Sequence, residues 1–272
     1  MARIAHFPRR PPGAEETCSL AECWAWSGMG VSRPVLGAGA RFSVHRPRPA
    51  PGGHSLVELA VGSGLERSNA VEAGWRVSPP LQGDGLPRLF VHRWIDGGPC
   101  WSDCGWREWS PRWAPGDALE MLEGKEVALG IALFQGRWWV WFDGEWLGYF
   151  ETKDWGGRLD EGATAQWFGE VFAPSAPVSG EMGNGRRGDD PDAARVEEIC
   201  QILPSTWVCR RVTSAFPHTS DATRYPLRPA GEDGFRYGGP GEPPAGTPRP
   251  PPSSASEGTP RATGRSATSP RG

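Results

Sequence analysis

The segment from residue 128 to residue 150 constrains the fold of this chain more than any other part of the sequence. Three predominantly apolar runs follow one another, at 128–134, 137–142 and 145–150. Only Gln135-Gly136 and Asp143-Gly144 separate these runs, and glycine allows the positive φ that two-residue hairpin turns need. The segment therefore predicts a three-stranded antiparallel meander.

Further short strands are predicted on both sides of this meander, whereas only one segment favours a helix. The helix is expected over 190–202, because Asp190-Pro191 can cap and start it and apolar residues recur three apart from Ala193 to Ile202. Ten short strands with one short helix predict an all-β fold, an antiparallel β-sandwich. The other strand candidates are 41–45, 55–61, 70–77, 88–95, 163–172, 206–212 and 234–237.

The aromatic residues define one domain. All 15 tryptophans lie between Trp24 and Trp207, and burying side chains of this size offsets the entropy lost on folding. Residues 242–272 have no aromatic residue, Val, Leu or Ile, so we expect a disordered tail rich in Pro, Ser and Gly. Residues 1–27 are expected to be an irregular N-terminal segment, which leaves 28–241 as one domain.

Composition and motifs exclude several functional classes. A net charge of -3 provides no positive electrostatic potential that would attract nucleic acid. The sequence contains no run of 18 apolar residues, the length needed to span a membrane. The sequence contains no phosphate-binding loop, zinc-peptidase or serine-hydrolase motif, and its five histidines are scattered singly, so we expect neither a metal nor a cofactor. No apolar core of a secretory signal is visible at the N-terminus. Nothing in the sequence indicates an oligomeric state.

The six cysteines fall into three close pairs. A disulfide bond within each pair would suit an oxidising compartment. Reduced thiols that act as small apolar residues fit the cysteine count equally well. Six cysteines allow 15 disulfide connectivities, and the sequence alone does not choose among them.

Two glutamates stand inside apolar, aromatic strand segments. Glu72 precedes Ala73-Gly74-Trp75, and Glu170 follows Trp167-Phe168-Gly169. Glutamate is uncommon in strands, and a carboxylate beside aromatic rings raises the free energy unless it is paired or protonated. Strand alternation could instead point each glutamate at solvent. Two such positions, each near a glycine and a tryptophan, favour a functional interpretation.

At these residues the sequence resembles the neprosin-type glutamic peptidases. The resemblance covers about residues 30–241 and rests on several stretches in the family's order. They are His54-Ser55-Leu56, Val71-Glu72-Ala73-Gly74-Trp75, Gly136-Arg137-Trp138-Trp139, Leu147-Gly148-Tyr149, Gln166-Trp167-Phe168-Gly169-Glu170-Val171, Glu181-Met182-Gly183-Asn184-Gly185 and 235–241.

The resemblance implies two strongly curved sheets, a groove that holds catalytic Glu72 and Glu170, and cleavage after proline, without a cofactor. It also implies a disulfide between Cys100 and Cys104 and a secreted or extracellular protein. Two carboxyl groups that share a water do not both ionise easily, so one can act as base while the other donates a proton. Such an enzyme should work at acidic pH on proline-containing peptides or proteins.

Aromatic residues beside the glutamates are candidates for substrate binding. Both faces of the strand at 137–142 are apolar, so its side chains either pack in the core or line an aromatic groove. An alternative function is a non-catalytic, tryptophan-rich β-sandwich that binds carbohydrate or extended peptide. The candidates for substrate contact are Trp75, Trp139, Trp141 and Trp167.

Overall fold

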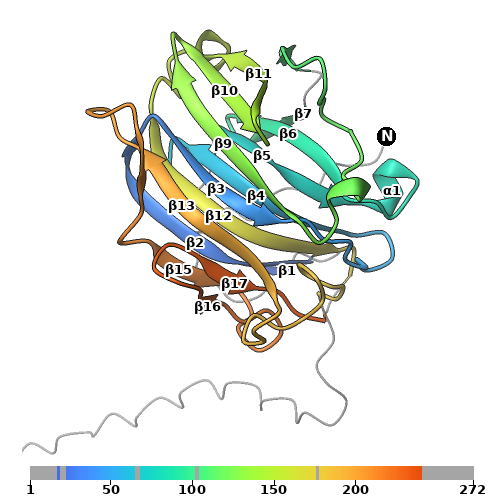
Figure 1. Ribbon diagram of the computed structural model, residues 1–272. Coiled ribbons are helices and arrows are strands. Elements are labelled where there is room, and N and C mark those ends of the chain that lie inside the picture. Colours follow the sequence, from blue (N-terminus) through green and yellow to red (C-terminus); the bar gives the residue numbers. More distant parts are fainter. Residues whose placement is uncertain (1–16, 19–22, 65–67, 102–103, 176–177, 241–272) are drawn as a thin grey trace, which may run out of the picture.

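The computed structural model describes residues 17–18, 23–64, 68–101, 104–175 and 178–240. Two large antiparallel sheets stack face to face in an open sandwich (Figure 1). Helical structure in the described residues is limited to α1 (Pro79–Gln82) and two short 3₁₀ turns, Glu120–Leu122 and Thr152–Trp155. The predicted all-β sandwich is therefore confirmed.

Sheet A carries both predicted catalytic glutamates. Its strands are ordered β1-β2-β12-β4-β5-β6-β7, and β15 pairs with β2 beside this path. Strand β4 therefore lies between β12 and β5, which carry the two predicted catalytic glutamates. The strands are β1 (Thr17–Cys18), β2 (Cys23–Val35), β4 (His54–Gly62), β5 (Ala70–Val77), β6 (Arg88–Ile95), β7 (Gly98–Trp101), β12 (Gly162–Ala173) and β15 (Phe216–Thr219).

Sheet B covers one face of sheet A. Its strands are ordered β16-β17-β13-β3-β9-β10-β11-β8, and β14 pairs with β13. They are β3 (Gly37–Ser43), β8 (Arg107–Glu108), β9 (Glu126–Phe134), β10 (Arg137–Phe142), β11 (Glu145–Glu151), β13 (Ala194–Ile202), β14 (Cys209–Arg211), β16 (Arg228–Pro229) and β17 (Phe235–Tyr237).

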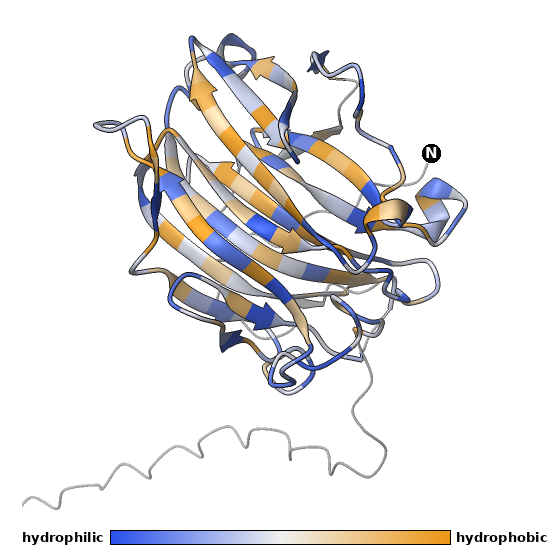
Figure 2. Cartoon of the chain, in the orientation of Figure 1, coloured by the Kyte–Doolittle hydropathy of each residue, from blue (hydrophilic) through white to orange (hydrophobic). Residues whose placement is uncertain are grey.

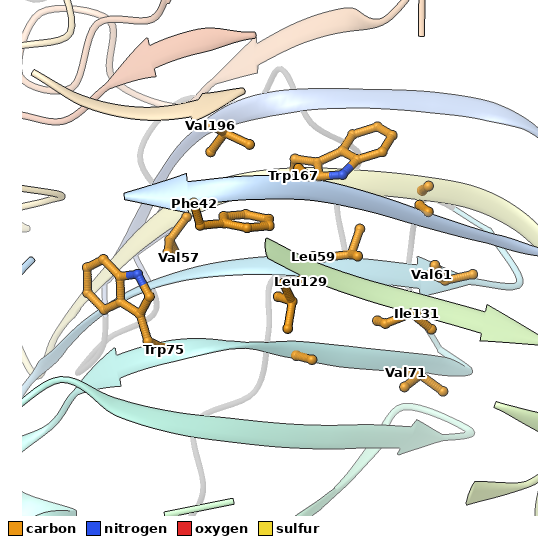
Figure 3. Close-up of a cluster of buried hydrophobic side chains, with 14 of the residues drawn as sticks. Phe42, Val57, Leu59, Val61, Val71, Trp75, Leu129, Ile131, Trp167 and Val196 are labelled. Carbon is orange, nitrogen blue, oxygen red and sulfur yellow. The ribbon is translucent and has the colours of Figure 1, made fainter. Parts of the chain in front are cut away.

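The hydrophobic core fills the space between the sheets. Alternate residues of β4, Val57, Leu59 and Val61, pack in one cluster with Phe42 and Leu129 of sheet B (Figure 3). The same alternation gives the strands their banded hydropathy (Figure 2). Because successive side chains of a strand point to opposite faces, the remaining residues of β4 must lie on the outer face of sheet A.

The predicted meander is confirmed as β9, β10 and β11. In both turns the two central residues have positive φ: 49° and 70° at Gln135-Gly136, and 42° and 98° at Asp143-Gly144. This is the backbone of a type I′ turn, whose twist matches that of the strands it joins.

The predicted helix over 190–202 is wrong, because this segment contains β13. A bulge between Glu197 and Cys200, with φ of 53° at Glu198, shifts the register of β13 against β3. Because of the extra residue, the inward-facing Val196 and Ile199 are three residues apart and not two, which imitates helical spacing. Asp190 caps a turn, since its side chain accepts from the backbone N–H of Asp192.

The ordered domain starts earlier than predicted. The boundary at residue 28 falls inside β2, which begins at Cys23 and pairs with β12 along most of its length. Gly28 and Gly30 weaken the strand signal of this segment in the sequence. The predicted tail at 242–272 lies outside the described residues.

The described cysteines are disulfide-bonded. Cys100 is joined to Cys104, as the resemblance implies, and Cys200 to Cys209. Cys23 also belongs to a disulfide. Such bonds persist in oxidising compartments. Within the described part of the chain, no helix has the length and apolar character needed to cross a bilayer.

Candidate active site

Buried polar side chains gather on the outer face of sheet A, the face turned away from sheet B. We call this group the polar face. Carboxylate and guanidinium groups are almost never fully buried unless they are paired, so their concentration here indicates function. The members are Glu58, Glu72, Arg76, His92, Gln166 and Glu170, each at most 7% exposed.

Strand β5 places Glu72 on the polar face. The flanking residues Val71 and Ala73 belong to the core between the sheets, so Glu72 points the other way. A carboxylate oxygen of Glu72 lies 3.3 Å from Nδ1 of His92, its register partner on β6. The buried imidazole therefore fixes the position of the Glu72 carboxyl.

Strand β12 places Glu170 on the same face. The carboxyl is 1% exposed, and its Oε1 lies 3.2 Å from Nε2 of His54, at the start of β4. The His54 ring is in turn stacked on Phe172, with ring centroids 5.3 Å apart. Each predicted catalytic glutamate thus has a histidine neighbour of its own.

The register separates the two glutamates. Glu72 is opposite Ala60 of β4, whereas Glu170 is opposite Leu56, four residues away along the same strand. Four residues correspond to roughly 13 Å along a strand, and the glutamates also lie two strands apart. They share one face of the sheet but no common row.

Glu58 lies between the two glutamates. It is opposite Phe168 of β12 and Gly74 of β5, so its diagonal neighbours are Gln166, Glu170, Glu72 and Arg76. Diagonal positions in a sheet are roughly 7–8 Å apart, within reach of long side chains. Glu58 is 0% exposed. It therefore connects the surroundings of Glu72 with those of Glu170.

Arg76 provides the positive charge of the polar face. Burial lowers the pKa of its guanidinium to about 10, while the negative charges of Glu58 and Glu170 act in the opposite direction. Arg76 therefore stays charged at neutral and acidic pH. This one guanidinium shares the polar face with the three buried carboxyl groups of Glu58, Glu72 and Glu170.

The sequence analysis did not single out Glu58, Arg76, His92 or Gln166. The signal for Glu58 was present, because it stands between Val57 and Leu59 in a predicted strand, as Glu72 and Glu170 stand in theirs. Arg76, His92 and Gln166 could be recognised as neighbours of the glutamates only from the register between strands.

Two of the predicted substrate-binding tryptophans lie on the wrong side of sheet A. Trp75 and Trp167 point into the core between the sheets, where each is at most 2% exposed (Figure 3). Their indole N–H groups donate to the backbone oxygens of Ser43 and Gly39. Successive side chains of a strand point to opposite faces, so Trp75 and Trp167, which directly follow Gly74 and Gln166 of the outer face, point into the core. Enclosed there, they do not reach the polar face.

The other two, Trp139 and Trp141, lie on β10 of sheet B. Their neighbours Trp138, Val140 and Phe142 are buried in the core, so Trp139 and Trp141 occupy the outer face of sheet B, away from Glu72 and Glu170. Trp141 and Trp146 line a hollow of about 460 Å³ on that face. The structure does not bring these side chains to the polar face.

The aromatic side chains that do lie beside the predicted glutamates come from β2 and β12. Trp24, Trp26 and Phe168 form a small buried cluster with Ala60, and Phe172 packs against it. Trp26 is the register partner of Glu170. Among the described residues, no three His, Cys, Asp or Glu side chains are grouped as a metal site would require.

Comparisons with known proteins found a family and several solved structures that this chain resembles. A family model described as Neprosin matches residues 51–240. A crystal structure of Scytalido-glutamic peptidase with a peptide-based transition state analogue superposes with a TM-score of 0.48 and 10% identity, covering 79% of this chain and 97% of that one. SCP-B, a member of the Eqolisin family of peptidases, in complex with the tripeptide Ala-Ile-His, gives a TM-score of 0.44 at 9% identity, with the same coverage.

Proposed function

The chain belongs to the Neprosin family of glutamic endopeptidases, and from this premise we propose that it hydrolyses peptide bonds on the polar face through Glu72 and Glu170. The observation that carries the proposal is the burial of both glutamates on one face of sheet A, next to a third carboxyl and a single guanidinium. Active sites bring buried groups of like charge close together where the reaction needs one group protonated and another ionised.

The chemistry needs one ionised and one protonated carboxyl. The ionised carboxyl takes a proton from water, whose oxygen attacks the scissile carbonyl carbon. A protonated carboxyl supplies the proton that the leaving amine requires. Because Glu72 and Glu170 do not face each other, Glu58 is the group through which a proton can be shared between them. Acidic pH keeps that proton in place, so activity should be highest at acidic pH.

The proposed substrate is an extended peptide or protein segment that contains proline, cleaved on the carboxyl side of proline. Trp24, Trp26 and Phe172 border Glu170 on the same face, and aromatic rings offer flat apolar surfaces for a pyrrolidine ring. These residues take the role first assigned to Trp75 and Trp167. The disulfides and the family, whose members are typically extracellular, support action in an oxidising, extracellular location.

The proposal is tested by incubating the full chain with proline-containing peptides from acidic to neutral pH and identifying the products by mass spectrometry. We expect new carboxyl termini at proline, formed fastest at acidic pH. The Glu170→Gln variant should lose at least about 10²-fold in kcat, whereas Glu197→Gln on sheet B should not. A folded chain that cleaves no peptide at any pH would contradict the proposed function.

The hollow on sheet B favours a second candidate function, binding of a sugar or an extended peptide. Trp141 and Trp146 line it, and Trp146 is 44% exposed. Replacing Trp141 by Ala should weaken such binding without changing peptide cleavage. Calorimetric titration with oligosaccharides would measure this, and the absence of heat with the native chain would exclude saccharide binding.

A further inference from the structure

The hollow of about 460 Å³ on the outer face of sheet B has glycines at the centre of its floor. Gly39 of β3 and Gly130 of β9 are register partners there, and both point outward because their neighbours along each strand belong to the core. A Cβ atom at Gly130 would meet its nearest neighbour at 3.5 Å, which is ordinary contact. Packing therefore does not require a glycine at this position. Glycine inside a strand often marks the close approach of a ligand or another backbone.

Two walls flank this floor. Cys200 of β13 lies in register with the glycines on one side, and Trp141 of β10 on the other. The backbones of the two walls are thus three strand spacings apart, roughly 14 Å. The Cys200–Cys209 disulfide belongs to the first wall, and Trp141 with Trp146 to the second. The space between them is a groove along β3 and β9 that admits one extended chain.

Glu198 supplies an unpaired charge at the hollow. Apart from Arg41 and Glu198, the residues that line the hollow are apolar or glycine. Arg41 is paired with Glu126 at 3.5 Å, whereas Glu198 forms no ion pair within the described part of the chain. Glu198 stands in the bulge of β13 with a φ of 53°, which is strained for a residue other than glycine. Bulges of this kind re-aim side chains, and this one presents a carboxylate to the hollow.

These surroundings favour a proline-rich peptide over a sugar. A sugar carries hydroxyl groups on all sides, and each needs a polar partner when it is enclosed, which this lining does not provide. Proline has an apolar ring and no backbone N–H. Proline-rich segments adopt polyproline II without internal hydrogen bonds and dock in aromatic-lined grooves at a low entropic cost. The carboxylate of Glu198 favours an arginine within such a segment.

The chain carries a segment of this kind beyond the described residues. Residues 248–252 read Pro-Arg-Pro-Pro-Pro. Tyr237 of β17 is the register partner of Ala194 on β13, and Cys200 lies roughly 20 Å further along β13 than Ala194. The chain from Tyr237 to Pro248 spans up to about 36–40 Å when extended. The segment is therefore long enough to reach the hollow.

We propose that the hollow is a docking site for a polyproline II segment and that residues 248–252 of this chain occupy it. The proline rings pack against the tryptophan wall, and the Arg249 guanidinium pairs with the Glu198 carboxylate. The tail is then held on the face opposite the polar face. The inference does not rest on the proposed function, since no residue of the polar face takes part. A single short segment binds weakly, so heating releases it before the domain unfolds and its removal leaves the Tm unchanged.

The first test compares two arginines of the tail in the full chain by ¹⁵N relaxation. The heteronuclear NOE of the Arg249 N–H should approach the values of the folded domain. The NOE of Arg265, which stands between Gly264 and Ser266, should stay low. Gly130→Val places a side chain on the floor of the hollow and should lower the NOE of Arg249 to that of Arg265. Equally low values for both arginines in the native chain would overturn the proposal.

The second test measures competition by calorimetry. A synthetic peptide with the sequence of residues 246–254 is titrated into the native chain and into the full-length variant Arg249→Glu/Pro250→Ser/Pro251→Ser, whose own tail no longer fits. The tethered tail has an effective concentration of roughly 1 mM, so a peptide with a Kd of about 0.1 mM should bind the native chain about tenfold more weakly than the variant. Equal affinity for both chains, or binding to neither, would overturn the proposal.

A third measurement tests the ion pair in the same variant background. Glu198→Gln should weaken binding of the peptide about two- to fivefold, the effect of an exposed ion pair, and about 1 M salt should remove the difference. Glu161→Gln is the matched control, because Glu161 is also exposed and forms no ion pair within the described residues. Equal affinities of these two variants would overturn the pairing of Arg249 with Glu198. Binding of an oligosaccharide in place of the peptide would overturn the proposed occupant.

Discussion

His45 shows how burial of a single residue affects the acid stability of the chain. Burial lowers the pKa of its imidazole from 6.5 to about 4, and the positive charge of Arg195 acts in the same direction. The folded chain therefore keeps His45 neutral where the unfolded chain protonates it. The free energy of unfolding should fall as the pH drops from about 6.5 to about 4, by up to about 3 kcal/mol from this group.

The His45→Gln variant should lose this part of the pH dependence. Below about pH 4 both states of the native chain are protonated at His45, so the group adds no further slope there. Urea unfolding at pH 7 and pH 4 measures the difference, and the variant should lose less stability between the two than the native chain. Equal losses in both proteins would show that His45 is not buried as described.

Single residues were partly predictable from the sequence. Glu72 and Glu170 were selected because a carboxylate in an apolar strand needs a partner, and both lie on the polar face. The same reasoning applied to Glu58 but was not used. Gln166 carries no charge, so its position in the sequence gives no comparable signal. Its place on the polar face follows from the register of β12 against β4, which one sequence does not reveal.

At the scale of strands, Gly74 allows β4 and β5 to approach closely beside Glu58. A Cβ atom at Gly74 would lie 2.0 Å from the backbone oxygen of Val57 and 2.8 Å from Cα of Glu58. Backbone atoms cannot rotate away, so the strands would have to separate. The Gly74→Ala variant should lose about 1–3 kcal/mol in the free energy of unfolding, together with activity.

Gly130 of β9 is the matched control for Gly74. A Cβ atom there would meet its nearest neighbour, the backbone oxygen of Ala38, at 3.5 Å, which is ordinary contact. Gly130→Ala should change the free energy of unfolding by less than about 1 kcal/mol. Chemical denaturation compares the two variants, and equal losses would refute the close approach of β4 and β5.

Strands could be predicted where the residues of the connecting turns determine the local structure. The turns at Gln135-Gly136 and Asp143-Gly144 specify the meander, because their backbone needs positive φ. The segment 194–202 was misread because a bulge changes the spacing of its apolar residues from two to three. Such a bulge depends on pairing with β3, so the pattern within the segment alone favours a helix.

The whole molecule depends on its first long strand. Residues Cys23 to Ser27 of β2 pair with the end of β12 that carries Glu170, and they include Trp24 and Trp26. A chain that starts at residue 28 should lose cooperative thermal unfolding, because this truncation removes the segment that pairs with the end of β12 and removes the disulfide that contains Cys23. A chain that ends at residue 241 should keep the native Tm. Calorimetry distinguishes the two, and a native Tm in the first would show that residues 23–27 are dispensable.

The central claim is that the polar face of sheet A is the active site and that Glu72 acts in it. The measurement that tests it most directly is kcat/KM of Glu72→Gln, compared at acidic pH with Glu197→Gln on one proline-containing peptide. We expect Glu72→Gln to fold with the native Tm and lose at least about 10³-fold, while Glu197→Gln stays within about twofold. Equal activity of the two variants would contradict the account.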